Sequence, residues 1–183
     1  ERGTDADGGD TIAVGVSDGS AEFTTDGATP AVLSISRIAG FFFVNRNGVA
    51  GTAAATVALT TPGNVVTLAN GTFVLEINTT GADVAEQITV GGEVFDVILD
   101  GDTPIRVDAL DIDLMLDVGG NVQTFEGNAS FERTTVGTAS RIAVAVSELT
   151  LDFEGVLQVT DGELLVLLTD SGVAAEGTVT VDV

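Results

Sequence analysis

The sequence predicts an all-β protein of many short antiparallel strands in an elongated repeat architecture, built as β-sandwich modules or as a β-solenoid. Three observations lead to this prediction. Apolar and polar residues alternate over short stretches, and no segment of 11 or more residues has the 3.6-residue period of a helix. Turn sequences containing Gly separate these stretches, and the two ends of the chain resemble each other.

Alternation is clearest in LDIDLMLDV (110–118). Its apolar residues from Leu110 to Val118 should face one side of a sheet, and Asp111, Asp113 and Asp117 should face water. The other predicted strands are 11–16, 32–38, 41–45, 53–60, 65–68, 73–78, 87–90, 94–99, 128–133, 142–146, 149–153, 164–168 and 178–183.

Turn chemistry is expected between these strands. Asn-Gly at 47–48 and 70–71 and Asp-Gly at 161–162 tolerate the positive φ that tight hairpins need. Pro-Gly at 62–63 and Gly-Gly at 91–92 and 119–120 also indicate turns.

Composition limits the partners and the setting. The formal net charge is −22, and all six basic residues are Arg. Such a charge repels phosphate backbones and anionic lipid surfaces, so we expect no nucleic-acid partner. A Lys-free, acid-rich chain is compatible with a halophilic or marine source, or with biased codon usage. No apolar run approaches the length of a membrane span, and the opening ERGTDADGGD looks like a processed start or a cut inside a longer protein.

A repeat is visible in IAVGVSDGSAEF (12–23) and IAVAVSELTLDF (142–153), whose isoleucines are 130 positions apart. Further on, Gly48-Val49-Ala50 matches Gly172-Val173-Ala174 at a separation of 124. We therefore expect a first partial copy over 1–59, the middle of a unit over 60–141 and the start of a second copy over 142–183. These parts could also form one continuous β body.

Both copies change the phase of their alternation at the same place. In the second copy the apolar set moves from even positions, such as Val146, to odd ones, such as Leu149. A turn or bulge is therefore expected at Ser147-Glu148, and at Ser17-Asp18-Gly19 in the first copy. If the repeat is real, Ile12, Val14 and Val16 should be as buried as Ile142, Val144 and Val146, and Phe23 should match Phe153.

The acidic, Lys-free and Cys-free strands, with phrases such as GVAG and LTLDFEG, resemble the repeat modules of very large secreted or surface proteins of bacteria and archaea, including adhesins. The resemblance is one of style and covers most of the chain. It implies an extracellular or cell-surface location, tandem or filamentous arrays, and a structural or adhesive role. Neighbouring modules or like chains, and surface glycans or proteins, would be the partners.

Missing residue types exclude most catalytic chemistry. The chain has no His, Cys, Trp, Tyr or Lys. Ser-His-Asp triads, Cys nucleophiles, Schiff-base lysines and His/Cys zinc sites are therefore excluded. A glycosidase with two carboxylates needs only Asp or Glu, but the aromatic platforms usual for sugars would have to be Phe. We expect no enzyme.

Calcium is the one cofactor that these oxygen ligands could bind. The candidate ligands are Asp5, Asp7 and Asp10 in DADGGD, which departs from the EF-hand pattern, and Asp100 and Asp102 in DGDTP with the nearby Asp108. A solvated acidic loop is the alternative at each place.

Phe41, Phe42 and Phe43 are three of the nine Phe in the chain. In a strand they would need cover on both faces, so we expect them in the core or at a contact between modules. The sequence thus predicts a non-catalytic structural or adhesive module of a large extracellular or cell-surface protein. The alternative is a calcium-dependent module that binds glycans.

Overall fold

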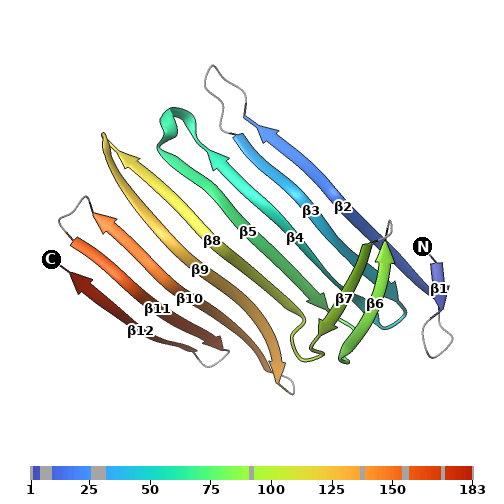
Figure 1. The fold of residues 1–183 in the computed structure, drawn as a ribbon. Helices are drawn as coiled ribbons and strands as arrows, with labels where there is room; N and C mark the ends of the chain where they lie inside the picture. The colour runs from blue at the N-terminus through green and yellow to red at the C-terminus, as the bar shows by residue number, and fades with distance from the viewer. Residues whose placement is uncertain are drawn as a thin grey trace.

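The computed structural model describes residues 2–4, 10–25, 32–90, 93–136, 139–153, 157–169 and 172–182. Within these residues, ten strands form one antiparallel sheet and two form a separate hairpin, which confirms the all-β antiparallel prediction (Figure 1). The sheet strands, in spatial order, are β1 (Arg2–Thr4), β2 (Asp10–Thr24), β3 (Val32–Asn45), β4 (Gly48–Thr60), β5 (Val66–Asn78), β8 (Ile105–Val118), β9 (Asn121–Val136), β10 (Ala139–Phe153), β11 (Leu157–Thr169) and β12 (Gly172–Asp182).

The sheet is a single-layered meander, because each strand pairs with its neighbour along the chain. The one interruption lies between β5 and β8, where β6 (Val84–Val90) and β7 (Glu93–Leu99) form the hairpin. A short 3-10 turn at Pro62–Asn64 joins β4 to β5. All ten sheet strands thus belong to one β body, while the elongated repeat architecture stays a prediction.

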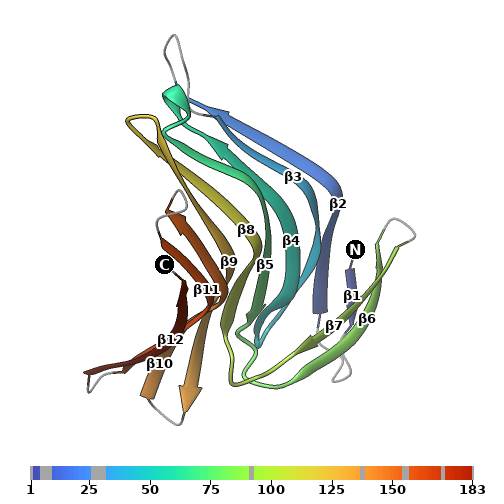
Figure 2. The same cartoon turned by 60° about the vertical axis from the view of Figure 1, so that its left-hand side comes forward.

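A line of bulges crosses the sheet near the middle of its strands, where Figure 2 shows the strands bending. Asp18 in β2 and Glu148 in β10 have φ angles of 54° and 55°, and the register with the next strand shifts beside each of them. The phase changes predicted at these two places are therefore confirmed as bulges. Three further non-Gly residues within sheet strands have positive φ at the same level: Arg37, Asp111 and Asp161.

The bulges also join segments that the sequence separates. Residues 142–146 and 149–153 belong to one strand, β10, because a bulge replaces the expected break. The turns expected at 70–71 and 161–162 were wrong for the same reason, since these residues lie inside β5 and β11. A residue pair that tolerates positive φ suits a bulge as well as a hairpin turn.

The alternation predicted for 110–118 fails at Leu110. Asp111 has a φ of 54°, and the β8–β9 register shifts between Ala109 and Ile112. Leu110 therefore shares a face with Asp108 and pairs with Thr72, whereas Ile112 lies on the opposite face and pairs with Gly127. The extra residue of the bulge exchanges the two faces partway along the strand.

One face of the sheet is apolar across nine strands, and we call it the apolar face. Cross-strand partners share a face, so rows of partners show its composition. The register shifts beside β4 come from extra residues in β3 and β5, and β4 itself has none. Ala53 and Leu59 therefore lie on the same face of β4, so the row of partners through Ala53 and the row through Leu59 belong to one face. The rows are Val16–Gly40–Ala53–Leu75–Val107–Phe131–Val144–Val166–Ala175 and Phe23–Leu33–Leu59–Leu68–Leu114–Phe125–Leu151–Val159–Val181.

The opposite face, which we call the acidic face, carries most of the charge in the strands. Its carboxylates include Glu22, Glu76, Asp108, Asp113, Glu126 and Glu132. One row on it runs from Glu76 through Arg106 to Glu132. The bulges keep most of the apolar side chains on the other face, because the phase changes in the two similar segments coincide with an extra residue in the strand.

The hairpin packs on the acidic face near one end of β2–β5, and there it forms the core (Figure 2). Phe41 and Phe43 lie beneath Val97 and Leu99 of β7. Asn78, at the end of β5, is 1% exposed, and its Nδ2 donates to the carbonyl oxygens of Ala82 (2.8 Å) and Asp100 (3.0 Å). Asn78 therefore holds both ends of the hairpin to the sheet.

The two copies pair in the same register. Each residue pair from Ile12↔Val44 to Phe23↔Leu33 has its counterpart from Ile142↔Leu168 to Phe153↔Leu157, register shifts included. The pairs of β3–β4 from Ser34↔Ala58 to Asn45↔Gly48 recur in β11–β12 in the same way. The strands that resemble each other in sequence therefore have matching neighbours.

The predicted burial of the first copy was wrong. Ile12 and Val14 are 54% and 59% exposed, and Val16 is also exposed, whereas Ile142, Val144 and Val146 are half-buried. β10 lies between two long strands, but on the outer side of β2 the described residues form only the three-residue β1. Phe23 is exposed as well, and the side chain of Phe153 lies outside the described set.

Candidate functional site

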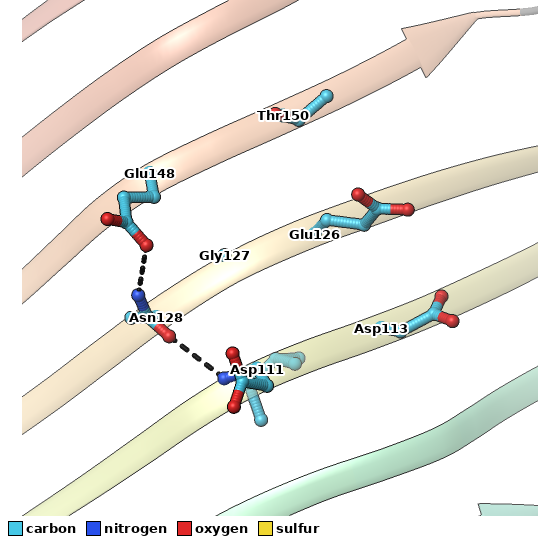
Figure 3. A pocket seen from close by; sticks show the side chains of 8 residues that line it. Asp111, Asp113, Glu126, Gly127, Asn128, Glu148 and Thr150 are labelled. Carbon is cyan, nitrogen blue, oxygen red and sulfur yellow. Dashed lines mark hydrogen bonds between the residues drawn. The ribbon is translucent and has the colours of Figure 1, made fainter.

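The bulges of β8 and β10 border a depression on the acidic face. It has a volume of about 370 Å³ and opens widely to solvent. β9 crosses its floor, and a Cβ at Gly127 would approach Ser147 O to 3.1 Å and Leu149 Cα to 3.2 Å, so the backbone of β9 lies close to β10 here. The lining residues are Asp111, Ile112, Asp113, Glu126, Gly127, Asn128, Glu148 and Thr150 (Figure 3).

Asn128 connects the two bulges through both ends of its side-chain amide. The backbone N–H of Asp111 donates to Asn128 Oδ1 at 2.8 Å, and Asn128 Nδ2 donates to Glu148 Oε2 at 2.6 Å. The residues at both ends have left-handed backbone conformations, which cost energy for side chains other than Gly. The amide of Asn128 helps to offset that cost, so its role here is structural.

Carboxylates dominate the remaining wall of the depression. Asp113 and Glu126 are direct cross-strand partners, so two like charges lie opposite each other. Asp113 Oδ1 is buried and has no hydrogen-bond partner. The arrangement attracts cations by its charge, but no three acidic side chains among the described residues are placed to hold one metal ion.

The metal ligands predicted from the sequence have other partners where they are described. Asp100 Oδ1 accepts a hydrogen bond from the backbone N–H of Asp102 in the turn before β8. Asp108 forms an ion pair with Arg106 at 2.9 Å, and this hydrogen-bonded contact raises the pKa of Arg106. Asp5 and Asp7 lie outside the described residues, and of Asp10 only the backbone, at the start of β2, is described.

The three consecutive Phe residues separate onto the two faces of β3. Phe41 and Phe43 lie in the core under the hairpin, with ring centroids 6.2 Å apart. Phe42 is on the apolar face, where its ring lies against Gly51 of β4. A Cβ at position 51 would approach Phe42 Cδ1 to 2.6 Å, so Gly51 leaves room for this ring.

Sequence reasoning missed Asn78 and Asn128, the two asparagines that hold the hairpin and the bulges. Both begin Asn-x-Ser/Thr sequences, Asn78-Thr79-Thr80 and Asn128-Ala129-Ser130, but such a sequence points to glycosylation and does not indicate a side-chain amide that holds strands together. It also missed a match at the start of the chain. Glu1-Arg2-Gly3-Thr4 resembles Glu132-Arg133-Thr134-Thr135, and Arg2 pairs with Ile12 as Arg133 pairs with Ile142.

No protein-family model, curated protein or solved structure matches this chain. None of the helical segments among the described residues is long and apolar enough to cross a membrane. What the chain itself offers toward a function is therefore the geometry of its sheet and the composition of its sequence.

Proposed function

We propose that this chain is a non-catalytic structural module of a large extracellular or cell-surface protein, and that it mediates assembly through its apolar face. The observation that supports this most is the row from Phe23 to Val181. All nine of its residues are Phe, Leu or Val, and they cross nine neighbouring strands. No catalytic group needs to be placed for such a surface to act.

The apolar face needs a cover for the sheet to be stable. Only seven apolar residues among those described are buried, and six of them belong to the core under the hairpin. Burial of apolar surface contributes about 25 cal/mol per Å² and is the main favourable term in folding. A sheet with one apolar face buries that face against a second layer in known architectures.

The occupant that fits best is the same face of a second copy. Nine strands spaced about 4.8 Å apart, with about 14 residues each at 3.3 Å per residue, present roughly 2,000 Å² on one side. A standard stable interface needs only about 800 Å² per partner. Face-to-face packing leaves the carboxylates of the acidic face in water, so the charge of −22 does not oppose contact at the interface itself.

The extracellular part of the proposal is supported by composition. An acidic surface with no Lys suits a salt-rich exterior. The calcium-dependent alternative has no comparable support, because the described carboxylates do not converge.

Two substitutions on neighbouring strands test the proposed assembly. Val144 of β10 lies on the apolar face, and Thr124 of β9 lies on the acidic face opposite Met115. Sedimentation of the full chain should show association that Val144→Asp abolishes and Thr124→Asp leaves intact. A monomeric wild-type chain, or equal association of both variants, would contradict assembly through the apolar face.

A further inference from the structure

Equivalent positions of the two copies differ in what covers them. Phe41 in β3 and Leu165 in β11 occupy the same place in the shared register, opposite Gly15 and Ala145. Phe41 is 0% exposed because the hairpin β6–β7 packs on it, whereas Leu165 is 50% exposed. On the acidic face, β10–β12 therefore present the seat of a hairpin, and none of the described residues occupies it.

A glycine of the second copy points to the same conclusion. Gly48 has a φ of 153°, and a Cβ there would approach the backbone of Thr79 to 2.6 Å. Its counterpart Gly172 has a φ of 146°, yet none of the described residues lies within 4 Å of the corresponding Cβ position. The open space around position 172 does not require Gly. If another residue packed against position 172 as Thr79 packs against Gly48, that position would require Gly.

The sheet edge supplies a third observation. The outer side of β4 is covered by β5, and the strand is continued by Thr79, whose N–H donates to Val49 O at 2.8 Å. β12, which matches β4, is the last strand of the described sheet, and Val173, which matches Val49, is 70% exposed. An edge of this kind is a template for a further strand.

We propose that the β10–β12 end is a docking surface for a segment like residues 66–103, contributed by a neighbouring unit of the same kind. A β5-like strand would pair with the outer edge of β12 in the register of β4–β5. A Thr79-like residue would lie on Gly172, and a β6–β7-like hairpin would cover Leu165. The inference deepens the proposed assembly role and rests on it, but it uses the acidic face and the edge rather than the apolar face.

A synthetic peptide of residues 66–103, added to the full chain, tests the docking surface. A shorter peptide of residues 66–78 contains the strand without the hairpin. We expect the longer peptide to bind about tenfold or more tightly than the shorter one, because it also buries Leu165. Leu165→Asp, at a half-exposed position that should not disturb folding, should remove this difference. Equal binding of both peptides to the wild-type chain would contradict the hairpin seat.

The register is tested by disulfide formation, which is unambiguous because the chain has no Cys. Ala55 pairs with Phe73 in β4–β5, and Val179 is the counterpart of Ala55. Val179→Cys should therefore form a disulfide with a peptide carrying Phe73→Cys, but not with the matched peptide carrying Leu68→Cys. Equal yields with the two peptides would overturn the proposed register.

A covalent version avoids dependence on the solubility of the peptide. A second copy of residues 60–103 joined after Val183 should raise the melting temperature, and Leu165→Asp should cancel most of the rise. No rise would contradict the inference. If these tests fail while Val144→Asp still abolishes association, the docking surface is wrong and the proposed assembly role stands. If the peptide docks but the chain is monomeric, the assembly role is wrong.

Discussion

Asn128 Nδ2 donates a hydrogen bond of 2.6 Å to Glu148 Oε2, and this contact joins a strand without a bulge to one with a bulge. The same side chain accepts from the backbone N–H of Asp111 in the strand on its other side. One residue therefore fixes the level at which two bulges occur. Because the bulges set which residues face which side, Asn128 affects both faces of the sheet.

Asn128→Ala should destabilise the sheet by about 1–2 kcal/mol, because it removes two hydrogen bonds, one of them to a charged group. Asn128→Asp should cost more, since it adds a carboxylate between Asp111 and Glu148. Urea denaturation measures both effects. Asn121→Ala, at the exposed start of the same strand, is the control and should change stability by less than about 0.5 kcal/mol. Similar losses at 121 and 128 would contradict the bridging role.

The left-handed backbone at Asp18 predicts an unusual order of stability among chains substituted in β2. Its φ of 54° suits Gly and opposes a β-branched residue. Asp18→Gly should be neutral or stabilising, whereas Asp18→Val should cost about 1–2 kcal/mol. Valine favours strands elsewhere, so Glu22→Val in the same strand should be tolerated. Thermal unfolding of the three variants gives the order, and a stable Asp18→Val chain would rule out the bulge.

The sequence was sufficient for the all-β class and for the place of the phase change in the two similar segments, where it left a turn or a bulge open. The phase change in IAVAVSELTLDF can be read directly, because two apolar sets of opposite parity need an extra residue between them. The alternation of 110–118 concealed the bulge at Asp111, because Leu110 happens to be apolar on the acidic side of the strand. Asn-Gly and Asp-Gly also could not distinguish a turn from a bulge, since both need positive φ.

The packing could not be predicted, because it depends on contacts far apart in the chain. Whether Phe41 or Phe42 is covered follows from where β6–β7 lies, and this depends on Asn78 and on the loop at 79–83. Exposure of Ile12 follows from its place near the edge of the sheet, which alternation does not reveal. The acidic depression arises where two bulged strands flank β9, and no local motif indicates it.

Asn78→Ala should release the hairpin from the sheet. Asn78 is buried, and its Oδ1 also accepts hydrogen bonds from Thr80 N–H and Thr80 Oγ1, so the substitution leaves several polar groups without partners. We expect a loss of about 2–4 kcal/mol, confined to this end of the sheet. Hydrogen exchange should then lose protection in β6 and β7 while β9 and β10 stay protected. Uniform loss over all strands would contradict a local clamp.

Salt should stabilise this chain more than it does a neutral protein. A net charge of −22 produces self-repulsion in the folded and the assembled states, and most of the carboxylates in the strands lie together on one face. Raising NaCl from 0.01 M to 1 M shortens the screening length from about 30 Å to about 3 Å, so the melting temperature and the degree of association should both rise. Calcium chloride at matched ionic strength separates general screening from binding. If the two salts raise the melting temperature equally, the effect is screening. If calcium chloride raises the melting temperature more than sodium chloride does, and the rise saturates at millimolar calcium, the calcium-dependent alternative is favoured.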